Sequence, residues 1–469
     1  MRRWLLVGVA LLTGCTVGPR YEPPAPPAGA TAPLVSLNPA VETTAQPPDA
    51  WWRLYNDSRL DAYLDEAFAA NTDLKAAEAN LSAARAALEG ARAGAYPATN
   101  VEAGAIYGRD PTTDEILELE GAKPQTTWID DTLIDVSYEF DLFGHVRRQV
   151  EAARADAAAA EAGRDVFRIT VAAETTRAYA QVCTLGEQLA VARQSYETVS
   201  HEAEINRQRR AAGAGSEFDV VRAEALAAQT RAAIPPLEGQ RRAALFQLTV
   251  LLGRTPAHAP VEAEACVTPP KLSALIPIGD GAALLKRRPD IRLADRRLAA
   301  ATARVGVAVA DLYPRIQLTG FYGGFATDPS DLFRNIGLGW GVGPKISWAF
   351  PNQAGPRARV RQAKAGAAYA LDTFDGAVLQ AQKETEQALA AYASELDHRQ
   401  ALGESQARAH RAFEIAHGQF LAGAIPNLDL LTAEQTMLTA DAAVAASDAT
   451  LAQDQINLFK ALGGGWRKA

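Results

Sequence analysis

The chain has 469 residues, of which 48% are hydrophobic and only 7% aromatic, so it is long enough to bury a large core that relies on small side chains. Its formal net charge at pH 7 is -8, from 47 Lys and Arg against 55 Asp and Glu. Because proteins that bind nucleic acids gather basic residues into patches, and none is evident here, we expect no nucleic-acid partner.

Residues 1–15 have the pattern of an export signal that ends in a lipidation site. A pair of arginines precedes the apolar run from Trp4 to Leu12, which is too short to span a bilayer, and LTGC ends at Cys15. We therefore expect a signal peptide at residues 1–14 and a lipid on Cys15, since Leu-x-Gly-Cys resembles a lipobox. Thr16 favours the outer membrane, because an Asp there would suggest retention in the inner membrane. An ordinary export signal with a chance cysteine is the alternative.

The segment that follows, residues 15–50, is rich in proline and has no periodicity. We expect it to be extended rather than packed, and a stretched chain of this length reaches roughly 100 Å. It would lead from the lipid to the folded body, which begins near Trp51.

Residues 51–260 predict a helix, a β-hairpin, a very long helix and a shorter returning helix. We expect the first helix at 58–94, strands at 101–108 and 132–140, the long helix at 142–212 and the returning helix at 217–252. Pro235 and Pro236 disturb the returning helix. At 1.5 Å per residue the long helix spans roughly 100 Å. Its apolar spacing of three and four predicts side-by-side packing in coiled-coil fashion, although a plain soluble helical bundle would show the same spacing.

The second half of the chain repeats this order at an offset of 210 residues. GAGSEFDVVRAE at 213–224 matches GAIPNLDLLTAE at 423–434, and SYEF at 137–140 matches SWAF at 347–350. Residues 281–462 therefore form a second repeat, after a connector at 261–280 and before a tail at 463–469. Its expected elements are helices at 281–311, 355–422 and 427–462 and strands at 316–324 and 338–348.

The strands alternate between apolar and polar side chains, which predicts sheets with two different faces. In the first hairpin Ile134, Val136, Tyr138 and Phe140 share one face, and Leu133, Asp135, Ser137 and Glu139 share the other. In the second hairpin Leu338, Trp340, Val342, Ile346 and Trp348 alternate with Gly339, Gly341, Gly343, Lys345 and Ser347.

Strands of this length are able to cross a bilayer, but four strands cannot close a barrel. Lipid allows no open sheet edge, so we expect the chain to share a barrel with copies of itself. Two soluble hairpins packed on helices are the alternative. The predicted fold class is mostly α with a small β part: a long α-helical barrel continued by a transmembrane β-barrel.

Cys183 and Cys266 are the other two thiols of an exported chain, which folds where disulfides persist. They could pair, or they could be two small buried residues that never meet, and only their geometry decides.

The sequence resembles the outer membrane factor family of TolC-like exit ducts, in its lipoprotein branch of NodT and OprM type. The residues that carry the resemblance are GCTVGPRYEPP at 14–24, DLFG at 141–144, LLGRTP at 251–256, the stretch 287–314 and GAIPNLDLLTAEQ at 423–435. The resemblance implies a homotrimer with a 12-stranded barrel, four strands from each chain. It also implies a periplasmic adaptor and an inner-membrane transporter of the resistance-nodulation-division type as partners.

The same resemblance implies that the segments 213–224 and 423–434, where each long helix ends and its returning helix begins, are hairpin tips that narrow the lumen and bind the adaptor. Asp429, its counterpart Asp219 and Phe420 would surround the aperture, and Gly213, Gly215, Gly423 and Asn427 would form the tips that dock the adaptor. Capping of the returning helices is the alternative role for Asp429 and Asp219.

The sequence shows no pattern for catalysis. The six histidines have no metal-protease spacing and there is no phosphate loop, so we expect no enzyme activity, no metal and no cofactor. The expected function is an outer-membrane exit duct of a tripartite efflux system that conducts small molecules or drugs. A type I protein-secretion channel and a non-conducting periplasmic coiled-coil scaffold are the alternatives.

Overall fold

The computed structural model describes residues 16–465 except for 110, 120, 122, 124, 125 and 273. The predicted signal peptide, the predicted lipidation site Cys15 and residues 466–469 of the predicted tail lie outside the described residues. The chain forms two compact units, each assembled from three segments of the sequence. The first contains the described residues up to Ala25, Asn80–Ala160 and Leu293–Phe374, and the second contains Pro26–Ala79, Glu161–Arg292 and the described residues from Asp375 onward.

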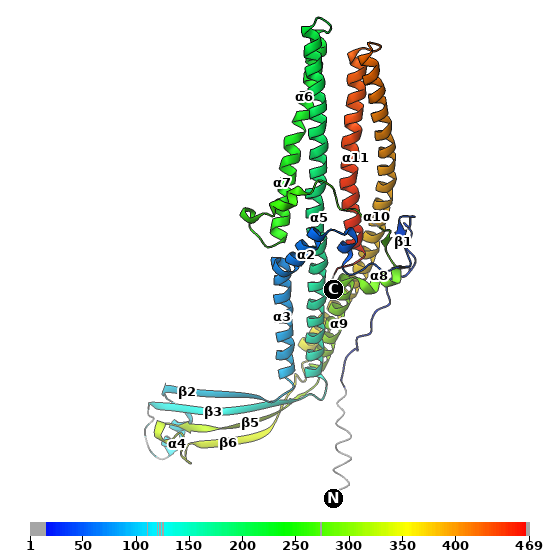
Figure 1. Cartoon of the computed structure of the whole chain (residues 1–469). Helices are drawn as coiled ribbons and strands as arrows, with labels where there is room; N and C mark the ends of the chain where they lie inside the picture. Colours follow the sequence, from blue (N-terminus) through cyan, green and yellow to red (C-terminus); the bar gives the residue numbers. More distant parts are fainter. Residues whose placement is uncertain are drawn as a thin grey trace. The chain divides into compact units, whose positions relative to one another are not determined.

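The first unit contains a four-stranded antiparallel sheet (Figure 1). Its strands lie side by side in the order β2 (Ala98–Gly108), β3 (Thr127–Phe140), β5 (Arg315–Ala326) and β6 (Leu338–Ser347). The two predicted hairpins are confirmed, and β3 also pairs with β5. A short helix, α4 (Pro111–Leu119), which the residue pattern did not predict, lies between β2 and β3 in the chain.

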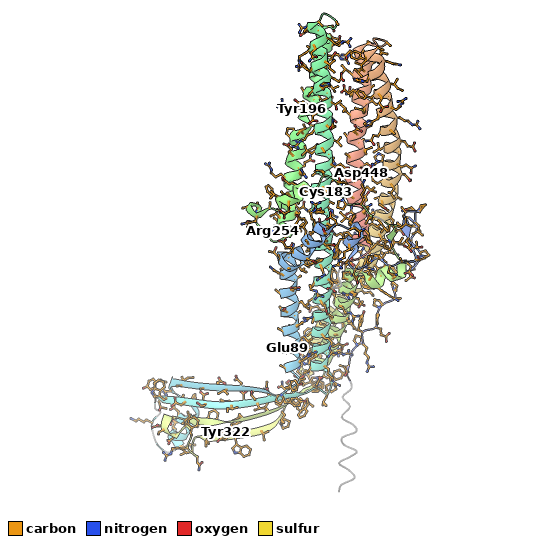
Figure 2. The ribbon with its side chains drawn as sticks, viewed as in Figure 1. Glu89, Cys183, Tyr196, Arg254, Tyr322 and Asp448 are labelled. Carbon is orange, nitrogen blue, oxygen red and sulfur yellow. A yellow bond between two sulfur atoms is a disulfide. The ribbon has the colours of Figure 1, made fainter. Side chains whose placement is uncertain are left out.

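The register of the strands gives this sheet one apolar face and one face that carries the polar residues. Ile134 pairs with Tyr322, which pairs with Trp340, so the three side chains share one face, where they are 47, 57 and 75% exposed. Figure 2 labels Tyr322 on the sheet. The opposite face carries Asp135, Ser137, Glu139, Lys345, Ser347 and the alternating glycines of β6, together with Phe321 and Phe325 of β5. The predicted alternation is confirmed, and the single chain leaves a broad apolar surface exposed.

Two helices are far longer than the rest. The helix α5 (His145–Ala211) has 67 residues and α10 (Ala354–Leu421) has 68, so each is about 100 Å long, as predicted. Pro356 lies in the first turn of α10, where a missing backbone N–H breaks no helical hydrogen bond. Across the described part of the chain, no helix has the length and apolar character needed to cross a membrane.

The predicted helix at 58–94 is in fact two helices, α2 (Ser58–Ala70) and α3 (Thr72–Ala93). Asn71 breaks it with an extended backbone, at φ -57° and ψ 129°. Its side-chain oxygen accepts hydrogen bonds from the N–H groups of Asp73 and Leu74, and its amide donates to the carbonyl of Leu251. The asparagine therefore caps the second helix, a role that this residue type favours over a helix interior.

Prolines explain the other two breaks. The predicted helix at 281–311 divides at Arg288 into α8 (Gly281–Arg287) and α9 (Pro289–Ala310), because the residue before a proline avoids the helical conformation. The returning helix at 217–252 divides into α6 (Glu217–Ala232) and α7 (Ile234–Leu251), since Pro235 and Pro236 fit only in a first turn. The second returning helix, α11 (Asn427–Ala461), has no proline inside it and is continuous.

The core of the second unit is built around aromatic side chains. Trp51, in the short 3₁₀ helix η1 (Trp51–Tyr55), is fully buried and stacks on Phe459 of α11 with ring centroids 4.7 Å apart. Tyr179 of α5 is also fully buried, and its hydroxyl donates to Asp57, which caps α2. The first residues of the folded body thus join helices that are far apart in sequence.

The proline-rich segment before Trp51 differs from its prediction. It is extended, with only the two-residue strand β1 (Val41–Glu42), which pairs in parallel with β4 (Ile276–Pro277). However, it is also packed: Val41 is buried, and the N–H groups of Val35 and Ser36 donate to the carboxylate of Glu386 on α10. The expectation of an unpacked segment was wrong, because low periodicity does not prevent a backbone from binding a neighbouring side chain.

Candidate functional site at the hairpin tips

The two hairpin tips, α5 to α6 and α10 to α11, have the same turn. Gly213 and Gly423 adopt φ of 72° and 70°, which only glycine adopts readily. After each glycine, the next N–H donates back to a carbonyl five residues earlier, from Ala214 to Arg209 and from Ala424 to Gln419. This is the pattern of a Schellman motif, which ends a helix sharply. The repeated glycines are therefore required by the backbone of both tips.

The first returning helix begins with a complete capping box. The Ser216 hydroxyl accepts from the N–H of Asp219 at 3.1 Å, while the Asp219 carboxylate accepts from the Ser216 N–H at 3.3 Å. The Ser216 hydroxyl also donates to that carboxylate at 2.6 Å, and this bond holds the pKa of Asp219 below its usual range. Asp219 therefore caps α6, as the alternative reading of the sequence expected.

The second tip begins differently. Pro426 occupies the N-cap position of α11 and gives no side-chain cap, while Asp429 is exposed and its carboxylate forms no hydrogen bond or ion pair with the described residues. Asn427 is buried and directs its amide toward the Asp219 carboxylate, at 3.5 Å. The two tips thus contact each other through Asn427 and Asp219, and the Asp429 carboxylate stays available.

Phe420 lies at the end of α10 and is only 5% exposed. The guanidinium of Arg209, on α5, lies 4.4 Å from the centre of its ring, which is a cation–π contact between the two long helices. Below it, Ala203, Ala223 and Leu431 form a small apolar cluster. Phe420 therefore joins the two hairpins within one chain.

A family model described as outer membrane efflux protein matches residues 63–254 and 282–464. The chain belongs to the outer membrane efflux protein family. It is 31% identical to the pyoverdine export outer membrane protein OpmQ of Pseudomonas aeruginosa over 89% of this chain and 87% of that protein. It is 28% identical to nodulation protein T of Rhizobium leguminosarum bv. trifolii over 97% of this chain and 96% of that protein.

Solved structures give the same result. The outer-membrane channel OprN is 34% identical, with a TM-score of 0.87 over 96% of this chain and all of that chain. The MtrE outer membrane channel of Neisseria gonorrhoeae, solved in its open state, is 26% identical, with a TM-score of 0.80 over 97% and 99%. The protein is accordingly an outer-membrane efflux channel.

A buried carboxylate in the tip region of this efflux channel was not recognised as a site residue from sequence. Glu434 of α11 is fully buried, and neither of its carboxylate oxygens has a hydrogen-bond partner in the structure. Burial raises the pKa of Glu434 from 4.5 to about 7, and the carboxylate of Glu202 on α5 contributes to the rise. The available signal was its spacing, because Glu434 falls on the same helix face as the buried Leu430 and Leu431.

Its counterpart in the first tip of the efflux channel has a different environment. Glu224 lies 210 residues earlier, is 47% exposed and forms an ion pair with Arg207 at 3.0 Å. In the second tip His417 stands where the first has Arg207, and it lies 3.7 Å from Glu202. The repeat therefore has one solvated carboxylate and one buried carboxylate at matching positions.

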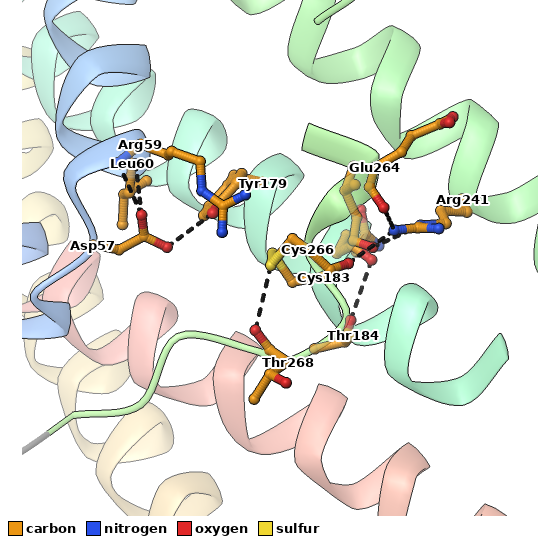
Figure 3. Close-up of a disulfide and its surroundings, with 12 residues drawn as sticks. Asp57, Arg59, Leu60, Tyr179, Cys183, Thr184, Arg241, Glu264, Cys266 and Thr268 are labelled. Atoms are coloured by element: carbon orange, nitrogen blue, oxygen red, sulfur yellow. Dashed lines mark hydrogen bonds between the residues drawn. A yellow bond between two sulfur atoms is a disulfide. The ribbon is translucent and has the colours of Figure 1, made fainter. Parts of the chain in front are cut away.

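The structure joins Cys183 of α5 and Cys266 of the connector in a disulfide (Figure 3). Arg241 of α7 donates to the carbonyls of Val182 and Cys266, at 3.1 and 2.8 Å, and so binds both sides of this link. A Cβ at Gly186 would lie 2.4 Å from the Cys266 carbonyl oxygen, so the connector approaches α5 too closely for any larger residue. The connector of the efflux channel is therefore fixed to the long helix.

Proposed function

We propose that three copies of this chain form one continuous duct, with a 12-stranded β-barrel in the outer membrane and a long α-helical barrel in the periplasm. The open sheet carries this proposal. Within the described residues β2 and β6 each pair on one side only, and one face of the sheet exposes large apolar side chains. Lipid tolerates no open strand edge and four strands are too few to close, so neighbouring chains would complete the wall.

The two faces of the sheet suit the two sides of such a wall. The face with Ile134, Tyr322 and Trp340 would contact lipid, and the face with Asp135, Glu139 and Lys345 would line a wet lumen. A wide, water-filled lumen would have little to recognise, so the duct would conduct passively and a partner would select the cargo. The chain would catalyse no reaction and need no metal or cofactor.

The duct would work within a tripartite system, with a periplasmic adaptor and an inner-membrane transporter of the resistance-nodulation-division type. The tips, with Gly213, Gly215, Gly423 and Asn427, would be the docking surface for the adaptor. Their identical turns support this role, because two matching tips in each of three chains present six similar sites.

The aperture would form where the tips converge. Asp429 would provide a ring of three carboxylates, and the absence of any bond from its carboxylate to a described residue supports this assignment. Asp219 and Phe420 would border the ring from positions fixed by contacts within the chain. Opening would then require the tips to move apart.

The ends of the chain and its internal symmetry belong to the same proposal. A lipid on Cys15, exposed by removal of residues 1–14, would anchor the mature protein, and residues 15–50 would lead to the folded body. Residues 51–260 and 281–462 would be duplicated halves, joined by 261–280 and followed by the tail 463–469. Equal order of elements and two separate matches to one family model support the duplication.

Single-channel conductance of the purified, membrane-extracted protein tests this function. A conducting trimer that carries lipid on Cys15 and co-purifies with an adaptor and a transporter is the expected result. A non-conducting oligomer would instead indicate a periplasmic scaffold, and co-purification with a type I secretion transporter would indicate protein export. Drug susceptibility of a deletion strain then separates small-molecule cargo from polypeptide cargo.

A further inference from the structure

The first unit contains an arginine-rich cavity beside the start of the described chain. The cavity has a volume of about 970 Å³ and is lined by five arginines and three carboxylates. Its wall includes Thr16, the residue after the predicted lipidation site, together with the end of α3, the end of β3 and the first turns of α5.

The wall next to the chain start is rigid. Arg148 of α5 is 3% exposed and donates to the carbonyls of Val17 and Gly18, both at 3.2 Å. Gly18, at a φ of 86°, approaches so closely that a Cβ there would lie 2.6 Å from the Cα of Gly306. The N–H of Val17 also donates to the carbonyl of Phe143. The cavity is thus built by the fold, and its shape does not depend on a loose terminus.

The three carboxylates of the cavity already have partners within the fold. Glu139 lies 3.1 Å from His145, and Glu151 binds Arg148 at 2.7 Å. Asp141 accepts from two backbone N–H groups at the start of α5 and from the Arg147 side chain. These acids therefore do not balance the remaining arginines.

Three arginines remain at the cavity, and they are exposed. The guanidinium groups of Arg20, Arg92 and Arg154 form no hydrogen bond or ion pair with any of the residues that the structure describes. They come from three different segments, the chain start, α3 and α5, and all three line the same cavity. A convergent group of guanidinium groups that have no carboxylate partner among the described residues is suited to a phosphate, which accepts several hydrogen bonds at once.

Aromatic side chains form the other part of the lining. Tyr96, Tyr138 and Phe140 lie at the ends of the strands beside the cavity, and Tyr96 and Phe140 are 70 and 42% exposed. Aromatic residues at strand ends are typical of the level at which a membrane barrel meets the headgroups. A site with aromatic groups on one side and guanidinium groups on the other matches a molecule with an apolar tail and an anionic head.

We propose that this cavity binds the phosphate headgroup of an anionic membrane phospholipid, such as phosphatidylglycerol, with Arg20, Arg92 and Arg154 as its ligands. The inference rests on the proposed function, because it needs the strand ends at the membrane surface. The lipid would occupy the position beside the attachment of the chain to the membrane. It would fix the depth of the duct through bonds to three separate segments.

Native mass spectrometry of the full-length oligomer, titrated with phosphatidylglycerol and with phosphatidylcholine, tests the inference. Loss of charge-assisted hydrogen bonds in the Arg92→Gln/Arg154→Gln variant should weaken phosphatidylglycerol binding by about tenfold or more. Binding of the zwitterionic lipid should not change. The matched control is Arg361→Gln/Lys364→Gln, which removes the same charge from exposed positions on α10 outside this cavity and should bind like wild type.

Equal affinity of wild type and the cavity variant for phosphatidylglycerol would overturn the proposal, and so would an equal loss in the control variant. Inorganic phosphate is added in a second arm, and displacement of the lipid at equal concentration would show a site for free phosphate instead. Conductance of the same preparations distinguishes a failure of the proposed duct from a failure of the lipid site. A wild-type protein that fails to conduct contradicts the proposed duct, whereas a conducting protein with unchanged lipid binding contradicts only the lipid site.

Discussion

The buried carboxylate of Glu434 should make the stability of the tips depend on pH. Its pKa is raised from 4.5 to about 7 in the folded protein, so the folded state binds a proton that the unfolded segment releases. The tip is therefore most stable below about pH 4.5 and loses stability as pH rises. Above pH 7 the buried carboxylate is ionised and the whole loss of stability is present. Each pKa unit corresponds to about 1.4 kcal/mol, so the cost is about 3 kcal/mol.

The variant Glu434→Gln removes the titrating group and keeps its shape. We expect local opening of the tip in wild type to become roughly 300-fold more favourable between pH 4.5 and pH 8, and to change far less in the variant. Glu202 of α5, whose charge contributes to the raised pKa of Glu434, lies 3.7 Å from His417 of α10.

Hydrogen–deuterium exchange of peptides from α11 measures this opening in the native oligomer, after correction for the intrinsic exchange rate at each pH. The control is Glu224→Gln at the matching position of the first tip, where the carboxylate is solvated and paired with Arg207. It should leave the pH profile as in wild type. Identical profiles for wild type and Glu434→Gln would refute the reasoning, because the ionised carboxylate would then cost nothing in its buried position.

Three further predictions concern the tips and the connector. Asp429→Ala should weaken the cation selectivity of the channel in a planar bilayer, since it removes a ring of three negative charges, and an unchanged reversal potential would contradict the aperture role. Gly423→Ala should destabilise its tip by roughly 1–2 kcal/mol because φ is 70° at this position. Its control, Gly418→Ala inside α10, should not destabilise the tip. Equal hydrogen–deuterium exchange rates in the two variants would show that the turn does not need glycine. Cys183→Ser/Cys266→Ser should reduce stability by about 4 kcal/mol, the entropy of a loop with 83 residues of separation, and a melting temperature equal to that of the non-reduced wild type would show that the bond is not formed.

Much of the architecture followed from local patterns. Alternation of Ile134, Val136 and Tyr138 with polar residues predicted the faces of β3 correctly, because side chains in a strand point to opposite sides in turn. The tips were predicted from Gly213 and Gly423, since a glycine that ends an apolar periodic run leaves few other conformations. Such features depend on a few adjacent residues, so they can be predicted from the sequence without knowledge of the tertiary structure.

Sequence alone could not find the features that depend on distant partners. The break at Asn71 was missed, although asparagine favours caps, because its bond to the carbonyl of Leu251 joins positions 180 residues apart. Asp219 and Asp429 look alike in the repeat, yet one caps its helix and contacts Asn427 while the other remains exposed.

By itself, then, the sequence determined the long helices, the order of the main elements, the two faces of the strands and the turns of the tips, because each of these is encoded by spacing over a few residues. Only the tertiary structure decided that Cys183 meets Cys266, that Glu434 is buried without a partner, and that Arg20, Arg92 and Arg154 line one cavity. Burial, charge pairing and cavity formation are properties of the assembled fold. They depend on which segments pack together, and the residues that decide this lie far apart along the chain.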